Sequence, residues 1–354
     1  MKLTVLNVSY PLACVAQDTA GGAEQILATL AEAIVRAGHR SIVLAPEGSQ
    51  CSGTLVATPS YTSDLDSRTQ QMARNEYRQA LRRLLMEYSV DLVHMHGIDF
   101  LDYLPESGVP VVVTLHLPPS WYPPEVFQIS RPDTYLVCVS QSQKRACLAG
   151  QIAAVVENGI AIEKCEPARR KGDYVAALGR VCPEKGFHLA MDAAGLSRMP
   201  LYLAGYVYGY PEHRDYFEKE IRPRLLNGHQ FLGTVGGVRK YKLLAEARCV
   251  LIPSLVPETS SLVAMEAMAC GTPVVAFRSG ALCEIVSDGR TGFLVNSAEE
   301  MANAISRVHT CDPTECRREA EQRFSAKRMC AEYFELYERA CGRSRHALAY
   351  EVQS

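Results

Sequence analysis

Short apolar runs alternate with amphipathic segments along the whole chain. In the first half, residues 23–39 have the apolar spacing of a helix, and Gly38 is the residue type that ends helices in a left-handed conformation. A second helix is expected at residues 70–88, and residues 47 to about 69 before it form a variable polar stretch. Buried strands are expected at residues 3–10, 41–46, 90–96, 109–116 and 134–140.

The alternation restarts after a polar segment, residues 156–173, which we interpret as a linker. Strands that alternate with helices in this way predict parallel sheets covered by helices, so the fold class is α/β with two Rossmann-like, doubly wound domains. We expect one domain over residues 1–165, a second over 166–325, a helix at 326–342 and a tail at 343–354. The strands of the second domain are expected at residues 174–180, 200–206, 229–233, 249–254, 272–277 and 292–295.

Composition narrows the class of protein. The 354 residues are 47% apolar and 21% charged with a net charge of −2, so no basic surface for nucleic acid is indicated. The 13 cysteines include no C-x-x-C pair and lie mostly in apolar runs, which favours buried thiols in a reducing compartment and predicts no metal site. Residues 1–11 lack the features of a signal peptide, and no apolar run approaches the ~20 residues that span a bilayer. We therefore expect a cytoplasmic protein, with peripheral membrane contact left open.

A helix at residues 262–270 directly follows the strand at 249–254, where α/β sheets bind their ligands. No acidic residue lies in its first turn, so its free N–H groups and dipole offer an anion site. Glu258 and Glu266 lie eight positions apart, on the order of 10 Å along a helix. Their carboxylates would accept hydrogen bonds from a sugar and a ribose on either side of a diphosphate. An ordinary capped helix with two solvated glutamates is the alternative.

A second cationic feature follows the strand at 174–180. Arg180 and Lys185 occupy a loop bent by Pro183 and Gly186, where two cations could neutralise a departing nucleoside diphosphate. A surface loop with two solvated charges is the alternative. Two independent anion-binding features in one predicted crevice favour the functional interpretation.

Several motifs, taken in order, resemble those of the retaining GT-B glycosyltransferases of family 4. The resemblance covers essentially the whole chain, and its C-terminal motifs are the more specific. The C-terminal motifs are ENGI at 157–160, GRVCPEKG at 179–186, LAGY at 203–206, FLGTV at 231–235 and E-x7-E at 258–266. The N-terminal ones are GGAE at 21–24, RAGH at 36–39, VHMHG at 93–97 and TLH at 114–116.

The resemblance implies a role for each matching residue in binding a UDP- or GDP-sugar. Glu258 would contact the donor sugar and Glu266 its ribose, and the final helix would cross back to the first lobe. His116 would lie beside the reacting sugar carbon, and Lys185 and Arg180 would stabilise the leaving diphosphate, which makes His116, Lys185, Arg180 and Glu258 the candidate catalytic residues. The further donor-binding candidates are Gly22, which lets its loop approach the phosphates, Val235 beside the base, and Ser260, Ser261, Leu262 and Val263 at the helix start.

One departure concerns the donor pocket. Where the family usually has E-G-F-G, this chain has Glu258-Thr259-Ser260-Ser261, which restricts the backbone and removes an aromatic ring. This change leaves the identity of the donor sugar open. The resemblance further implies retention of configuration, no metal or other cofactor, and a glycan, lipid-linked or small-molecule acceptor bound by the first lobe. Three rivals remain: a sugar-nucleotide 2-epimerase of the same architecture, a non-catalytic nucleotide-sugar-binding protein, and an NAD-dependent oxidoreductase, which the missing GxGxxG disfavours.

Other polar motifs have simpler interpretations. Asp64-x-Asp66 resembles a metal-binding DxD, but it lies in the variable polar stretch and is expected to be solvated. His94 and His96 share one strand face, where packing or substrate contact is favoured over a metal site with two ligands.

Trp121 and Tyr122 form a stiff aromatic loop that either stacks on an acceptor or plugs the structure. The arginines of the helix at 70–88 have acidic neighbours, which favours a solvated face over a membrane contact.

Overall fold

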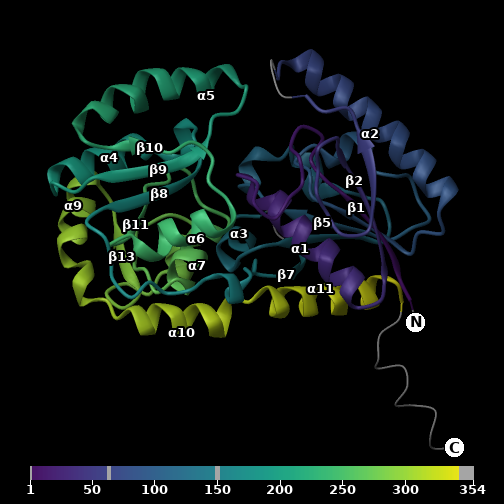
Figure 1. Cartoon of the computed structure of the whole chain (residues 1–354). Helices are drawn as coiled ribbons and strands as arrows, with labels where there is room; N and C mark the ends of the chain where they lie inside the picture. The colour runs from purple at the N-terminus through teal and green to yellow at the C-terminus, as the bar shows by residue number, and fades with distance from the viewer. Residues whose placement is uncertain (1, 62–64, 148–151, 343–354) are drawn as a thin grey trace, which may run out of the picture.

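Two parallel sheets organise the chain into two lobes that lie side by side in a computed structural model describing residues 2–61, 65–147 and 152–342 (Figure 1). Among these residues, seven strands form the first sheet in the order β3-β2-β1-β4-β5-β6-β7. Six strands form the second in the order β10-β9-β8-β11-β12-β13. Every strand pair is parallel, and the strand order reverses beside β1 and beside β8, where ligands of α/β proteins bind.

The first lobe alternates strands and helices from β1 to β7. Its elements are β1 (Thr4–Val8), α1 (Gly22–Arg36), β2 (Arg40–Pro46), β3 (Thr54–Thr58), α2 (Ser67–Glu87), β4 (Leu92–Met95), β5 (Val111–Leu115), β6 (Thr134–Cys138), α3 (Gln141–Ala146) and β7 (Ile152–Val155). One apolar core lies between the sheet and α2, and another between the sheet, α1 and the last helix of the chain.

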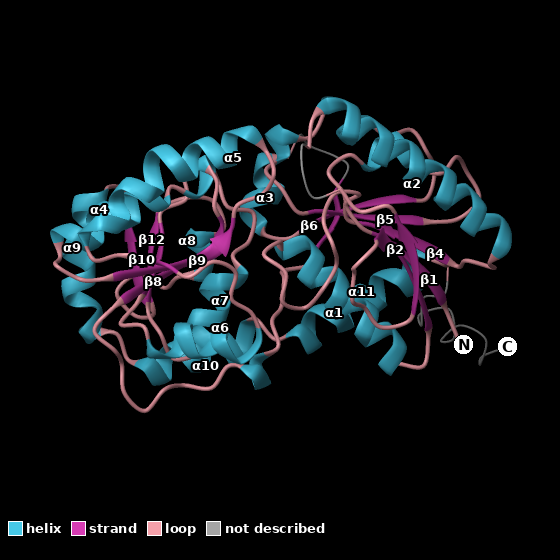
Figure 2. Ribbon diagram, turned by 45° about the horizontal axis from the view of Figure 1, so that its top comes forward, coloured by secondary structure: helices cyan, strands magenta, loops and turns pink. Residues whose placement is uncertain are grey.

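The second lobe repeats this alternation with helices on both faces of its sheet (Figure 2). One core lies under α4 and α9 and the other under α6, α7 and α10. The elements are β8 (Val175–Arg180), α4 (Phe187–Leu196), β9 (Leu201–Tyr206), α5 (Pro211–Tyr216), β10 (Gln230–Phe231), α6 (Gly237–Glu246), β11 (Val250–Ile252), α7 (Leu262–Ala269), β12 (Val274–Phe277), α8 (Leu282–Ile285), β13 (Gly292–Val295), α9 (Ala298–Arg307) and α10 (Pro313–Arg323).

Two strands were not expected from the sequence. β3 lies inside the stretch taken as variable and polar, and it pairs with β2 at the edge of the first sheet. β7 lies just before the polar linker and pairs with β6. Asp66 is the N-cap of α2, where its side chain accepts a hydrogen bond from the Thr69 N–H at 2.8 Å. Asp66 of the DxD pattern is therefore a helix cap. The other aspartate of the pattern, Asp64, lies outside the described residues.

The last helix, α11 (Ala326–Ala340), returns to the first lobe (Figure 1). Its buried face carries Tyr333 and Tyr337, whose hydroxyls reach the first sheet. The Tyr337 hydroxyl lies 2.7 Å from His94 Nδ1, and His94 Nε2 lies 2.7 Å from Thr114 Oγ1, which in turn lies 2.8 Å from the Tyr333 hydroxyl. Burial lowers the pKa of His94 well below its usual value, so the ring is neutral and serves packing. None of the described helices is long and apolar enough to cross a membrane.

Tyr337→Phe is expected to lower the free energy of unfolding by about 1–3 kcal/mol, because it leaves a buried ring nitrogen of His94 without its partner. Urea unfolding monitored by circular dichroism measures this change. Tyr206→Phe, which alters an exposed tyrosine, is the control and should stay within about 0.5 kcal/mol of the wild type. Equal stability of the two variants would contradict the role of this hydrogen bond.

Candidate active site

A cavity of about 530 Å³ lies between the two lobes. Its walls come from the ends of β1, β4 and β5 in the first lobe and from the ends of β8 and β11 in the second, together with the starts of α1 and α7. The carboxyl ends of parallel strands meet at one edge of each sheet, and this cavity lies where the two edges face each other.

The amino ends of two helices meet at the cavity. Gly22 begins α1 and Leu262 begins α7, and a side-chain carbon added to Gly22 would lie 3.5 Å from Leu262 Cδ1. Ser261 caps α7 by accepting a hydrogen bond from the Ala264 N–H at 3.3 Å, and the first turn of α7 holds no acidic residue. The amino end and dipole of α7 therefore direct positive potential at this space, which suits an anion, whereas the first turn of α1 carries the acidic Glu24.

Glu24 is a buried carboxyl in the first turn of α1 and was not among the site residues predicted from the sequence. Its side chain folds back over Gly21, and a side-chain carbon at position 21 would collide with the Glu24 carboxyl. Burial raises the pKa of Glu24, while nearby Arg180 opposes that rise. The third position of a helix is where a carboxylate commonly turns back toward the cap residue, so the GGAE motif held this signal.

Lys185 is held next to Glu258 by two tight loops. The 3-10 turn η5 (Pro183–Lys185) is followed by Gly186, whose φ of 63° and close approach to the Pro253 carbonyl leave no room for a side chain. The Leu255 N–H donates to the Glu184 carbonyl at 2.8 Å, which ties η5 to the loop before α7.

Glu258 is nine-tenths buried, and its Oε1 lies 2.6 Å from Lys185 Nζ and also accepts from the Ser254 hydroxyl. The carboxylate is therefore paired with the ammonium group of Lys185 in this structure. A bound diphosphate would have to compete for the same ammonium group.

Two neutral histidines form the first-lobe wall. His96 Nδ1 lies 3.0 Å from His116 Nε2, and the Thr259 hydroxyl of the second lobe donates to the His116 carbonyl at 2.7 Å. Burial lowers the pKa of His116 to about 3 and that of His96 well below its usual value. Both rings are therefore uncharged at neutral pH and offer hydrogen bonds without a positive charge.

Most of the candidate residues from the sequence come together here. The cavity is lined by Gly22, His116, Arg180, Lys185, Glu258, Ser260, Ser261, Leu262 and Val263. Glu258 precedes α7 in a loop, so the helical estimate of its distance from Glu266 does not apply.

Two of the predicted donor-binding residues, Glu266 and Val235, do not line this cavity. Glu266 lies one turn inside α7, where its Oε1 is 2.7 Å from Lys240 Nζ and both side chains are more than nine-tenths buried. Burial raises the pKa of Glu266, and Lys240 opposes that effect. Val235 packs against the core under α6 and α7. Their predicted contacts with the ribose and the base stay predictions.

Aromatic side chains line part of the cavity. Tyr122 is buried and its hydroxyl accepts from the Leu117 N–H at 3.3 Å, so it closes the loop structurally. Trp121 lines the cavity but remains 36% exposed. The hydroxyls of Tyr10 and Tyr210 meet across the two lobes at 3.3 Å. Of the two roles considered for this loop, Tyr122 has the structural one, and Trp121 keeps a face available for a ligand.

Comparisons with known proteins agree with this architecture. The profile of Glycosyltransferase Family 4 matches residues 20–164, and that of Glycosyl transferases group 1 matches residues 172–310. Phosphatidyl-myo-inositol mannosyltransferase of Mycobacterium leprae is 26% identical over 82% of this chain and 84% of its own length. D-inositol 3-phosphate glycosyltransferase of Saccharomonospora viridis is 37% identical, but the match covers only 31% of this chain and 27% of that relative.

Solved structures extend the similarity to the whole fold. AviGT4, a glycosyltransferase involved in avilamycin A biosynthesis, is 25% identical with a TM-score of 0.72, and the match covers 96% of this chain and 98% of AviGT4. Sucrose-phosphate synthase of Thermosynechococcus elongatus superposes with a TM-score of 0.76 at 21% identity, over 97% of this chain and 100% of that chain. HepE of Anabaena, solved with UDP and glucose, has a TM-score of 0.72 at 20% identity, over 94% and 99% of the two chains. The two facing parallel sheets are thus the GT-B fold of these structures.

Proposed function

Because this chain belongs to the family 4 glycosyltransferases, we propose that it transfers a sugar from a UDP- or GDP-sugar to a hydroxyl acceptor with retention of configuration and without a divalent ion. The convergence of two helix amino ends with Arg180 and Lys185 on one cavity carries this proposal. Together they supply the positive charge that a metal ion supplies in other transferases.

The donor would lie with its diphosphate against the start of α7 and its sugar toward the first lobe. Glu258 would hold sugar hydroxyls once Lys185 turns from the carboxylate to the phosphate, and neutral His116 would accept or donate a hydrogen bond beside the reacting carbon. Trp121 offers an apolar face to an acceptor bound in the first lobe. The relatives named above act on different acceptors, so a glycan, a lipid-linked sugar and a small molecule are all candidates.

The proposed step is a displacement on one face of the sugar. The bond from the anomeric carbon to the diphosphate oxygen breaks, and the acceptor oxygen bonds to the same face of that carbon. The acceptor proton passes to the departing phosphate oxygen, so the leaving nucleoside diphosphate acts as the base. Arg180, Lys185 and the α7 amide groups stabilise the negative charge that develops on the leaving group. Closure of the lobes would exclude water and so prevent hydrolysis of the donor.

The proposal predicts that UDP or GDP, and their sugars, raise the thermal stability of the protein, by about 2.7 kcal/mol at a hundredfold excess over Kd. With a panel of acceptors, release of nucleoside diphosphate should require an acceptor and continue in EDTA, and NMR of the product should show the donor's anomeric configuration.

The rival activities give different results in the same assay. Conversion of the sugar nucleotide without an acceptor would identify a 2-epimerase. Tight binding with no released diphosphate across the whole panel would identify a binding protein. A change in nicotinamide absorbance would identify an oxidoreductase.

A further inference from the structure

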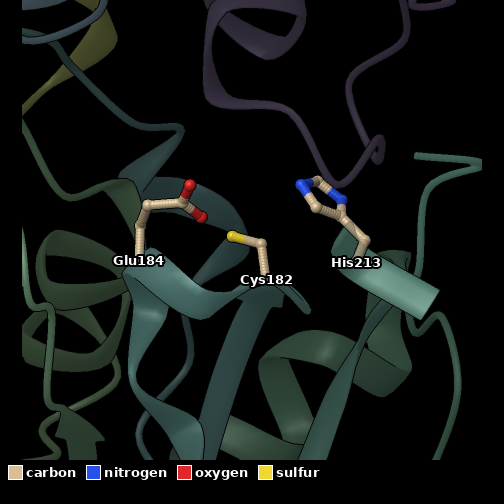
Figure 3. A group of neighbouring side chains, drawn as sticks. All are labelled: Cys182, Glu184 and His213. Carbon is tan, nitrogen blue, oxygen red and sulfur yellow. The ribbon is translucent and has the colours of Figure 1, made fainter. Parts of the chain in front are cut away.

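Three side chains with metal-binding atoms converge at one edge of the proposed donor site (Figure 3). Cys182 follows β8, Glu184 lies in the η5 turn, and His213 projects from α5. The cysteine sulfur, a carboxylate oxygen of Glu184 and a ring nitrogen of His213 all lie within 4.8 Å of one another. Glu184 and His213 line the cavity, while Cys182 lies just behind its wall.

The histidine has a buried nitrogen without a partner. His213 is 9% exposed, and among the described residues its Nδ1 has no hydrogen-bond partner. Leaving such a group unpaired costs about 1–3 kcal/mol. The rings of Tyr210 and Tyr208 lie 5.1 and 6.3 Å away and hold the imidazole in place. Figure 3 shows the ring nitrogen farther from the main chain, Nε2, facing Cys182 and Glu184, so Nε2 is the atom that would bind an ion and Nδ1 lies on the other side of the ring.

The cysteine is also enclosed. Cys182 is 1% exposed, and its sulfur donates to the Arg180 carbonyl at 3.6 Å and lies within hydrogen-bonding reach of the Glu184 side chain. Cys182 is the extended N-cap residue of η5 and Glu184 lies within the turn, and the side chains of both reach His213. The sequence pattern hid this arrangement, since the third member lies on a helix beyond β9.

The chemical types of the three ligand atoms indicate which metal ion would bind. One thiolate, one imidazole and one carboxylate are the ligands that Zn²⁺ takes in three-ligand sites, whereas Mg²⁺ and Ca²⁺ prefer oxygen alone. Zinc bonds of about 2.0–2.3 Å put neighbouring ligand atoms about 3.5 Å apart, so the side chains need to close by about an ångström. The thiolate and the carboxylate cancel the two positive charges of the ion. A neutral complex avoids the repulsion that a bare dication would meet beside Arg180 and Lys185.

We propose that Cys182, Glu184 and His213 bind one Zn²⁺, with a fourth position open to the cavity, and that the bound ion inhibits transfer. The inhibitory part rests on the proposed function. The ion would tie η5 to α5, and η5 carries Lys185, which must leave Glu258 to reach the donor phosphates. Zinc would thus hold η5 in the position in which Lys185 pairs with Glu258. The transfer reaction itself would need no metal.

Binding is tested with the reduced, chelator-treated full chain and Zn²⁺ or Co²⁺ alone, so that no substrate is required. We expect one tight Zn²⁺ equivalent by competition with a chromophoric chelator, and a thiolate-to-metal absorption band with Co²⁺. Cys182→Ser and His213→Ala should each weaken Zn²⁺ binding at least about 100-fold, since each removes a direct ligand. The controls are Cys283→Ser and His309→Ala, which alter an exposed cysteine and an exposed histidine elsewhere.

Urea unfolding of the metal-free variants shows whether each is folded, and Glu184→Gln provides a third ligand variant if one is not. Zinc affinity equal in the wild type and Cys182→Ser would overturn the site. Once an acceptor is known, Zn²⁺ should slow transfer by the wild type and spare Cys182→Ser, and EDTA should restore the rate. Tight binding with unchanged transfer would overturn the inhibition alone. Failure to find any transfer would count against the proposed function and would leave the binding result standing.

Discussion

Lys185→Ala is expected to reduce kcat/KM by about 10²–10³-fold, because it removes one of the two side-chain cations that we propose stabilise the leaving diphosphate. The loss should appear mainly in kcat, since a charge that develops in the transition state is stabilised more than the charge already present on the donor. The measurement is release of nucleoside diphosphate at varied donor concentration.

Three comparisons separate this effect from a structural one. Lys185 Nζ also pairs with the buried Glu258 carboxylate, so the variant's unfolding free energy must be measured beside its kinetics. Lys219→Ala removes a lysine that is 70% exposed on the surface of the second lobe and should leave kcat/KM unchanged. Lys185→Arg keeps the charge and should recover part of the activity. Turnover of Lys185→Ala within a few-fold of the wild type would show that the lysine has no such role.

The sequence predicted best those parts of the site whose structure is determined by residues adjacent along the chain. The start of α7 could be predicted because a buried strand ending at Ile252, a cap at Ser261 and an apolar helix follow one another along the chain. The loop of Lys185 was recognisable because Gly186 and Pro183 constrain its backbone locally. Neighbours along the chain decide such features, so their periodicity and turn residues are visible without a structure.

Contacts between distant segments were not predictable in this way. The pairing of Lys240 with Glu266 joins α6 to α7, and His213 reaches Cys182 across β9. Position 240 is a lysine on an amphipathic helix, which local pattern alone assigns to the solvent. β3 was missed for a related reason, because an edge strand needs only one pairing partner and therefore carries a weak apolar signal.

The ion pair between Lys240 and Glu266 leads to the largest expected loss of stability. Lys240→Met should lower the free energy of unfolding by about 3–5 kcal/mol, because it leaves a buried carboxylate without its counter-charge. The methionine fills a similar volume, so the loss is electrostatic rather than a cavity effect. Lys242→Met, on the same helix but 67% exposed, is the matched control and should change stability by less than about 0.5 kcal/mol.

The pH dependence of this loss gives an independent check of its cause. Burial raises the pKa of Glu266 above its unfolded value, and removing Lys240 takes away the charge that opposes the rise. A carboxyl with a raised folded-state pKa destabilises the protein above that pKa and is harmless once protonated. The stability deficit of Lys240→Met relative to the wild type should therefore be greatest at neutral pH and shrink as the pH falls toward the unfolded pKa of about 4.3.

Adding Glu266→Gln to Lys240→Met should recover much of the stability at pH 7, since no buried charge is left to compensate. A Lys240→Met loss below about 1 kcal/mol, or one that does not vary between pH 7 and pH 5, would contradict the electrostatic role of this buried pair.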